Sequence, residues 1–156
     1  MTEHQELIQT SLKRMLELMG VGDTSLSIED RNGHLFFNIK TADSKLLIGQ
    51  YGQNLQALQH IVRLLVRKQV GLDAADEKLN FSLDVENYRR EREEFLEALA
   101  RKAASRVRET KQMLILKPMG SSDRKIIHAL LSASSDLSTE SIGDEPERRI
   151  VIKLRA

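Results

Sequence analysis

Two short stretches of this 156-residue chain contain residues whose types and spacing suit contact with a nucleic-acid backbone. The first is GQYG, residues 49–52, which stands immediately before a long amphipathic run. Glycines let the chain turn sharply at a helix N-terminus, where unpaired N–H groups and the positive end of the helix dipole attract an anion such as a phosphate. A plain turn between two helices would need the same residues, and the bare GxxG spacing arises easily by chance.

The second stretch is DRKIIH, residues 123–128. Arg124 and His128 are four residues apart, so on a helix they project from one side, and we expect that side to face away from Ile127 and Leu131. An arginine can contact a phosphate with two hydrogen bonds, and a histidine ring can donate a hydrogen bond or stack on a base. A solvated helix face is the alternative. In either case we predict that alanine at both positions changes stability by no more than about 0.5 kcal/mol each.

The charges of the chain are arranged in blocks, although the formal net charge is only +1. Residues 45–72 hold four bases and no acid, residues 73–97 hold nine acids and four bases, and residues 101–128 hold eight bases and two acids. Local basic stretches in a nearly neutral chain are typical of polyanion binding, although solvated helix faces also carry them.

Several classes of function find no support in the sequence. There are no cysteines, the four histidines show no metal-ligand spacing, and HExxH, GxSxG and Walker-type patterns do not occur. Hydrolysis through His128 would lack a nucleophile or a paired carboxylate. We therefore expect no metal, no cofactor, no catalytic residues and no enzymatic activity. The first ten residues lack an apolar leader segment, and no run approaches the roughly 18 apolar residues of a membrane span. We expect a cytoplasmic protein without membrane insertion.

The first half of the chain predicts the element order αββααβ. Apolar periodicity predicts a helix over 5–19, two strands over 25–30 and 34–40 with a tight turn between them, and a short helix over 43–48. A long helix over 53–69 and a third strand over 78–85 follow the glycine break. On the long helix we expect Leu55, Leu58, Val62 and Leu65 to face the core, and Gln56, His60, Arg63 and Arg67 to line a polar outer face.

The second half predicts about three strands and two helices. A helix over 86–109 has an apolar stripe that includes Phe95, and strands are expected over 113–117, 137–142 and 148–154, with a helix over 123–134. The fold class is therefore α+β, with one domain over 1–85 and a second over 86–156 that starts with the long connecting helix.

Four segments of the chain resemble the bacterial Jag family, also called SpoIIIJ-associated proteins. IGQYGQNLQALQHIV is similar to its KH domain, LDVENYRREREEFLEALARKAA to its inter-domain helix, and LKPMGSSDRKIIHALL with TESIGDEPERRIVI to its R-three-H (Arg-xxx-His) domain. The resemblance covers nearly the whole chain. It implies a KH-like domain followed by an R-three-H domain, which bind single-stranded nucleic acid, mainly RNA.

The chain departs from the family pattern at three places. Gln50 and Tyr51 are uncharged where relatives usually carry basic residues in the loop, and Ser121 and Ser122 replace a usual proline and aromatic. Many relatives carry an additional N-terminal Jag domain, and this chain begins at the KH helix, so we expect that domain to be absent. The six aromatic residues are few for a stacking platform, and an aliphatic KH groove fits better.

The resemblance and the residues together predict two RNA-binding surfaces. The expected site of the first domain comprises Lys45, Gly49, Gln50, Tyr51, Gly52, Arg63 and Arg67. The expected site of the second comprises Lys117, Arg124, Lys125, His128, Arg148 and Arg149. We also expect that aspartate at both Gly49 and Gly52 weakens RNA binding without unfolding the domain.

The leading hypothesis is a cytoplasmic, non-enzymatic protein that binds single-stranded RNA, with single-stranded DNA as a further ligand. The resemblance alone implies post-transcriptional regulation tied to cell-envelope growth or division. The alternative is a protein-interaction module that binds a KH-domain partner, a second copy of itself or a secretion ATPase. The uncharged loop favours this alternative.

Overall fold

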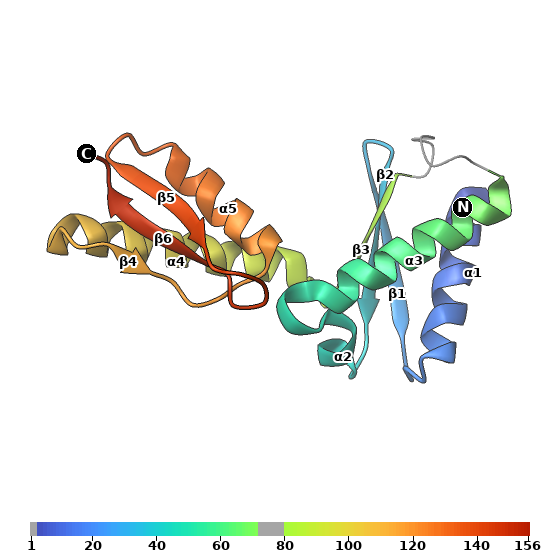
Figure 1. The fold of residues 1–156 in the computed structure, drawn as a ribbon. Coiled ribbons are helices and arrows are strands. Elements are labelled where there is room, and N and C mark those ends of the chain that lie inside the picture. Colours follow the sequence, from blue (N-terminus) through green and yellow to red (C-terminus); the bar gives the residue numbers. More distant parts are fainter. Residues whose placement is uncertain (1–2, 72–79) are drawn as a thin grey trace. The chain divides into compact units, whose positions relative to one another are not determined.

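The computed structural model describes residues 3–71 and 80–156, and the chain divides into two compact units, Met1–Tyr88 and Arg89–Ala156. Each unit has its own three-stranded sheet and its own buried core. Both units combine helices with strands, and the predicted α+β class is confirmed (Figure 1).

The first unit has the predicted element order αββααβ. Its elements are α1 (Glu3–Leu18), β1 (Ser25–Arg31), β2 (His34–Lys40), α2 (Ser44–Ile48), the single 3-10 turn η1 (Gln50–Gly52), α3 (Gln53–Val70) and β3 (Phe81–Val85). β1 and β2 form an antiparallel hairpin, whose turn places Asn32 and Gly33 at positive φ, and β3 pairs with β2 in parallel. The first two residues of the predicted third strand, 78 and 79, lie outside the described residues.

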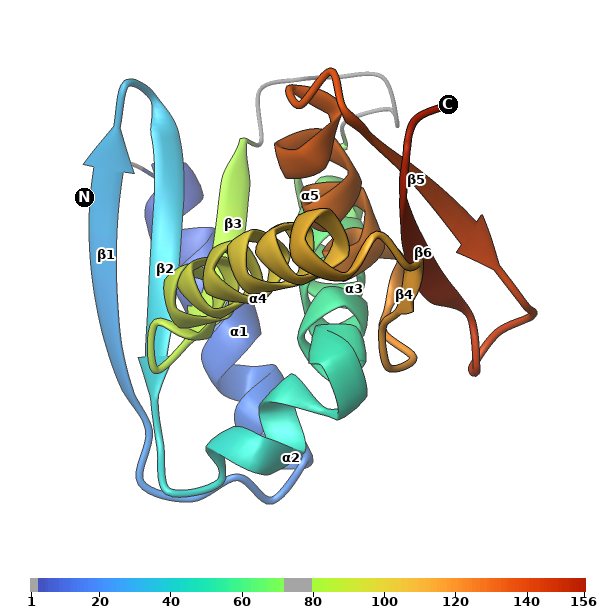
Figure 2. The same ribbon diagram turned by 90° about the vertical axis from the view of Figure 1, so that its left-hand side faces the viewer.

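Helices α1 and α3 cover the same face of this sheet (Figures 1 and 2). Their buried side chains meet Phe37, Phe81 and Leu83 from the strands. The prediction for α3 is right at Leu55, Leu58 and Val62 but wrong at Leu65, which is 37% exposed. Val66 is buried in its place, because it continues the row of residues that lie one helical turn apart.

Side chains of α3 also bond the free edge of β3. Gln59 accepts a hydrogen bond from the backbone N–H of Leu83, and the Arg63 guanidinium donates to the backbone carbonyl of Phe81. The same guanidinium lies 5.4 Å from the centre of the Phe81 ring. Arg63 and Arg67 are both half-buried, so the expectation that they line a polar outer face is wrong. The side of α3 that carries Arg63 faces the edge of the sheet.

The second unit contains α4 (Tyr88–Thr110), which begins at the last residue of the first unit, β4 (Leu114–Ile115), α5 (Ser121–Ser132), β5 (Leu137–Ile142) and β6 (Arg149–Leu154). The strands pair antiparallel in the order β4-β6-β5. These three strands and two helices match the prediction in number and order. Their bounds differ by at most two residues, since α5 both starts and ends two residues earlier than predicted, and β4 is shorter than predicted. Gly120 is extended and Ser121 already takes part in the helix.

The core of the second unit lies between the two helices and the sheet. α4 contributes Leu96, Val107 and three alanines, Ala100, Ala103 and Ala104. Phe95, predicted to be buried, is 54% exposed, and the Arg92 guanidinium lies 5.3 Å from the centre of its ring. Adjacent residues on a helix are about 100° apart, so the turn that buries Leu96 directs Phe95 away from the core.

Candidate nucleic-acid interface

The loop between α2 and α3 depends on glycine at two positions. Gly49 has φ 69° and Gly52 has φ 77°, a region that residues with a side chain rarely adopt. A Cβ atom at position 49 would lie 2.4 Å from Cγ of Asn54, whose amide donates a 2.8 Å hydrogen bond to the carbonyl of Leu46. A Cβ atom at position 52 would lie 3.0 Å from the ring of Tyr88.

These contacts bear on the predicted effect of aspartate at both glycines. Either aspartate would stand at an unfavourable positive φ, and at position 49 its Cβ atom would also have to displace the Asn54 side chain, so we expect the loop to change shape. That the domain stays folded remains a prediction, but a loss of RNA binding in this variant would not separate the added charge from the changed loop. A test of the loop needs a residue that can be replaced without distorting the backbone. Gln50 is suitable because its side chain is exposed.

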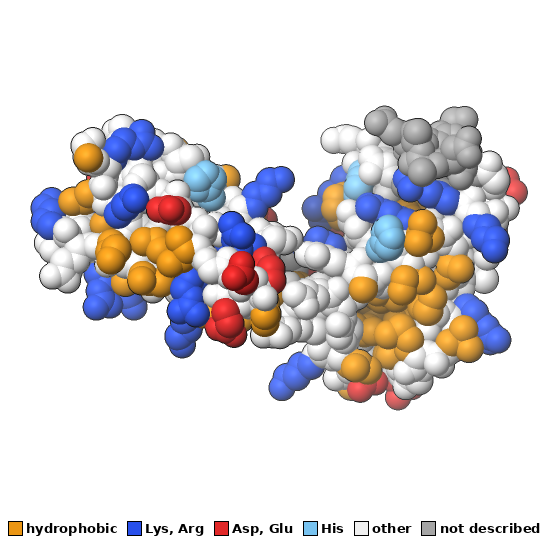
Figure 3. Space-filling view, in the orientation of Figure 1, with side chains coloured by type: hydrophobic (Ala, Val, Ile, Leu, Met, Phe, Trp, Pro, Cys, Tyr) orange, Lys and Arg blue, Asp and Glu red, His pale blue; other side chains and the backbone are white. Residues whose placement is uncertain are grey.

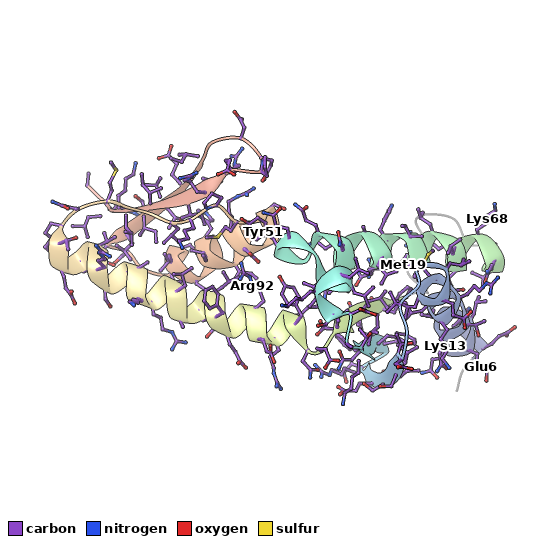
Figure 4. All side chains as sticks on the ribbon, turned by 90° about the horizontal axis from the view of Figure 1, so that it is seen from below. Glu6, Lys13, Met19, Tyr51, Lys68 and Arg92 are labelled. Atoms are coloured by element: carbon purple, nitrogen blue, oxygen red, sulfur yellow. The ribbon has the colours of Figure 1, made fainter. Side chains whose placement is uncertain are left out.

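The loop leads into a helix end that no side chain caps. Gly52 is the N-cap of α3 and provides no side-chain acceptor for the N–H groups of the first turn. Tyr51 is half-buried beside this end (Figure 4), and Lys45 is exposed on the preceding helix. Residues 45–72 contain no acid. An uncapped helix N-terminus in an acid-free segment attracts anions.

A pocket of about 310 Å³ opens in the second unit between α5 and the strands β5 and β6. Lys125 and His128 line it from α5, and Arg148 lines it from just before β6. The other lining residues are Arg124, Thr139, Glu140, Ser141 and Ile150. The structure thus brings together Lys125, His128 and Arg148, as the sequence predicted.

Hydroxyl groups of β5 orient two of these side chains. Nδ1 of His128 hydrogen-bonds to Oγ1 of Thr139, and Nε of Arg148 donates a 2.9 Å hydrogen bond to Oγ of Ser141. Neither Thr139 nor Ser141 was predicted from the sequence. The signal was present in their spacing of two, because alternate residues of a strand lie on the same face.

Arg124 does not lie on an exposed face. Its side chain is only 10% exposed, Nη1 donates a 2.6 Å hydrogen bond to the carbonyl of Met119, and Nη2 pairs with the carboxylate of Glu145. The predicted exposure is wrong because Arg124 lies in the first turn of α5, where its side chain meets the chain entering the helix and a loop from a distant part of the sequence. The small predicted cost of removing it rested on that exposure, and a larger loss of stability is now expected.

Two other expected residues lie away from the pocket. Ile150 and Ile152 of β6 belong to the core, so Arg149, which is adjacent to Ile150, points to the opposite face of the sheet and pairs there with Glu147 at 3.4 Å. Lys117 is exposed and is not part of the pocket lining. The predicted six-residue site is therefore divided between separate surfaces of the second unit.

Two ion pairs connect α4 to the start of α5 and to the segment between α5 and β5. At the start of α5, Arg92 of α4 donates two hydrogen bonds to the buried carboxylate of Asp123, at 2.6 and 3.1 Å (Arg92 is labelled in Figure 4). Directly before β5, Asp136 pairs with Arg108 at 2.7 Å, and this hydrogen bond is the main cause that lowers the pKa of the Asp136 carboxyl. The helix that carries His128 and the loop that follows it are thus both bonded to α4.

Known proteins resemble this chain over most of its length. Residues 94–154 match the R-three-H domain, and this range contains α5 and all the pocket residues. The RNA-binding protein KhpB of Clostridium symbiosum is 36% identical over 145 residues, which are 92% of this chain and 63% of that protein. The chain therefore contains a match to the R-three-H domain and is similar over most of its own length to a protein named RNA-binding protein KhpB.

Other proteins named RNA-binding protein KhpB show a similar degree of identity. RNA-binding protein KhpB of Bacillus subtilis strain 168 is 36% identical over 133 residues, 84% of this chain and 62% of that protein. The Lactiplantibacillus plantarum protein of the same name is 32% identical over 130 residues, 83% of this chain and 39% of that protein. The chain therefore spans less than two thirds of the length of these relatives.

Two kinds of feature are missing from residues 3–71 and 80–156. None of the helices in these ranges is both long and apolar enough to cross a bilayer. The same ranges hold no cluster of three or more histidine, aspartate or glutamate side chains that could bind a metal ion.

Proposed function

We propose that this protein binds single-stranded RNA without acting on it chemically, and that the pocket of the second unit is its main contact surface. One observation carries the proposal. Lys125, His128 and Arg148 converge on a pocket within the residues that match the R-three-H domain. The relatives named RNA-binding protein KhpB support the same ligand.

The pocket has the chemistry that a nucleotide needs. Two cationic side chains can neutralise a phosphate, and the guanidinium of Arg148 can donate to it with a fixed geometry because Ser141 already holds Nε. The His128 ring offers a stacking face or a second hydrogen bond, and Ile150 forms an apolar wall. Contacts to phosphate and to one face of a base imply little sequence preference, so single-stranded DNA is expected to bind as well.

The α2–α3 loop would make a weaker second contact. The uncapped end of α3 and the nearby Lys45 favour a phosphate, whereas Gln50 and Tyr51 add no charge. Arg63 bonds the edge of β3 and would support the groove rather than contact RNA. We therefore expect the first unit to contribute less to the affinity than the pocket does.

Binding of a single-stranded RNA oligonucleotide by fluorescence anisotropy tests the pocket. His128→Ala and Arg148→Ala should each weaken binding about tenfold, because each removes a charge-assisted or ring contact. Arg149→Ala is the matched control, since it removes the same charge one residue away on the opposite face of the sheet. Equal losses for Arg148→Ala and Arg149→Ala would rule out the pocket as the specific contact.

Salt dependence provides an independent check on the same complex. In a plot of the logarithm of the binding constant against the logarithm of the salt concentration, each neutralised phosphate of a single strand contributes about −0.7 to the slope. About four or five phosphate contacts therefore predict a slope of about −3. Arg148→Ala should reduce the magnitude of this slope, and Arg149→Ala should leave it nearly unchanged. A wild-type affinity that does not vary with salt would contradict an electrostatic RNA surface.

The cellular role is proposed from the family resemblance. We propose post-transcriptional regulation connected with cell-envelope growth or division. Crosslinking the tagged protein to RNA in cells, followed by sequencing, should recover transcripts of envelope or division genes. Recovery of RNA without such transcripts would remove the envelope role and leave RNA binding intact.

An apolar surface of the first unit favours a second candidate function, binding of a KH-domain partner or a second copy of the chain. Ile61, Leu64 and Leu65 of α3 are 43%, 51% and 37% exposed, and Leu46 of α2 is 55% exposed. Apolar side chains gather on this face in Figure 3. Contiguous exposed apolar side chains often mark a protein contact. Light scattering measures the molecular mass of the wild type and of Leu64→Glu in solution. If the chain self-associates through this surface, the wild type should be a dimer and the variant a monomer.

A further inference from the structure

Arg124 and Glu145 connect two segments that are far apart in the sequence. Arg124 lies in the first turn of α5, and Glu145 lies in the loop between β5 and β6. Nη2 of Arg124 pairs with Oε1 of Glu145, while Nη1 of the same guanidinium donates a hydrogen bond to the carbonyl of Met119. One buried guanidinium therefore joins the chain before α5 to the β5–β6 loop.

The same connection reaches the pocket through Arg148. The N–H of Met119 donates a 3.2 Å hydrogen bond to the carbonyl of Arg148, so Met119 bonds both to the Arg124 side chain and to the Arg148 backbone. Glu145 lies in the same loop, shortly before Arg148. Arg124 thus holds the loop directly at Glu145 and, through the Met119 backbone, next to the residue that lines the pocket.

The charge of Glu145 is opposite to what a phosphate-binding surface favours. Its side chain is 55% exposed, and the hydrogen bond from Arg124 is the main cause that lowers the pKa of its carboxyl below the usual value. The carboxylate is therefore ionised at neutral pH. Electrostatics alone predicts that removing this negative charge strengthens RNA binding.

We propose that Arg124 is a positioning residue that acts on RNA binding through Glu145 and Met119, and that the acidic Glu145 consequently supports binding rather than opposing it. The proposal rests on the function proposed above for the pocket. Arg124 keeps the β5–β6 loop in the conformation that presents Arg148 to the pocket. The Arg of the Arg-xxx-His pair thereby has a different role from His128, whose ring is exposed in the pocket.

The direction in which Glu145→Ala changes the RNA affinity tests the proposal. Glu145→Ala removes a negative charge and the Arg124 contact, and Glu147→Ala removes the same charge two residues away, where the side chain pairs with Arg149 on the other face. We expect Glu145→Ala to bind a single-stranded RNA oligonucleotide about three- to tenfold more weakly than Glu147→Ala does. Equal or tighter binding by Glu145→Ala would overturn the proposal.

Salt dependence and a conservative variant separate positioning from general damage. If Arg148 loses its phosphate contact, the log–log salt slope of Glu145→Ala should fall in magnitude by about 0.7, although the variant is more positive than the wild type. Arg124→Lys keeps the charge but cannot reach both partners with a planar fork, so it should weaken binding to a similar extent. Wild-type affinity in Arg124→Lys would overturn the proposal, provided circular dichroism shows that the variant is folded.

The pocket itself is tested in the same series. If His128→Ala and Arg148→Ala weaken binding while Glu145→Ala does not, the pocket stands and the positioning role is wrong. If none of the three variants affects binding, the proposed pocket function fails, and the positioning role fails with it.

Discussion

The two candidate binding surfaces are built in different ways. The α2–α3 loop of the first unit consists of backbone held in shape by Gly49 and Gly52, and it adds no charge of its own at Gln50 and Tyr51. The pocket of the second unit consists of side chains from α5, β5 and β6. A surface made of backbone depends on local conformation, whereas a surface made of side chains depends on the packing of distant segments. Substitutions should therefore affect the two units in different ways.

The largest expected effect is on the stability of the second unit. Arg124→Ala leaves the buried Met119 carbonyl without its side-chain donor and removes the contact to Glu145, and it should lower the free energy of unfolding by about 2 to 3 kcal/mol. Lys125→Ala, at the exposed neighbouring position, should change it by no more than about 0.5 kcal/mol. Urea unfolding followed by the NMR signals of α5 and β6 measures both, and similar values would contradict the buried role of Arg124.

The corresponding test in the first unit concerns Gly49. Gly49→Ala adds a Cβ atom that must displace the Asn54 side chain at a positive φ, so we expect a loss of about 1 to 3 kcal/mol. Gly20→Ala is the control, because Gly20 has φ 71° but no atom within 4 Å of the added Cβ. Thermal unfolding of the two variants separates the steric contribution from the backbone strain. A smaller loss at Gly49 than at Gly20 would show that Asn54 moves without cost.

Acid should destabilise the second unit through two carboxylates. The pKa values of Glu145 and Asp136 are lowered in the folded protein, chiefly by hydrogen bonds from Arg124 and Arg108. A lowered folded pKa gives stability that is fully present above the unfolded pKa, near ~4, and is lost as the pH falls through the folded pKa. The thermal unfolding midpoint of the wild type should therefore decrease as the pH is lowered from about 5 to about 3. The double variant Glu145→Ala with Asp136→Ala should show a smaller decrease over the same pH range.

The smallest expected effect is a gain of binding at the loop. Gln50→Lys adds a positive charge at an exposed position beside the uncapped end of α3, and it should tighten RNA binding about two- to threefold at low salt. Gln56→Lys, which adds the same charge one turn into α3, is the control. Equal gains from both variants would mean that the loop attracts RNA only through overall charge.

The predictions made from the sequence succeeded where a local pattern was sufficient. The hairpin at Asn32 and Gly33, the helix that follows Gly52 and the strand pair around residues 143–147 all depend on turn residues and on apolar periodicity, and all were located correctly. The predictions failed at Leu65 and Phe95, where apolar residues stand at the border of a buried stripe. At such positions the facing element decides which side chain is covered.

The sequence by itself determined the α+β class, the element order and the presence of a GxxG turn and an Arg-xxx-His pair, because these features depend on residues that are close together in the chain. Only the tertiary structure decided that Arg124 is buried, that Arg63 bonds the edge of β3, and that Lys117 and Arg149 lie away from Lys125, His128 and Arg148. Each of these outcomes depends on a carbonyl, a carboxylate or a sheet face that comes from a distant segment. Residue spacing shows which side chains share a helix face, but the partner that covers that face is determined only when the chain folds.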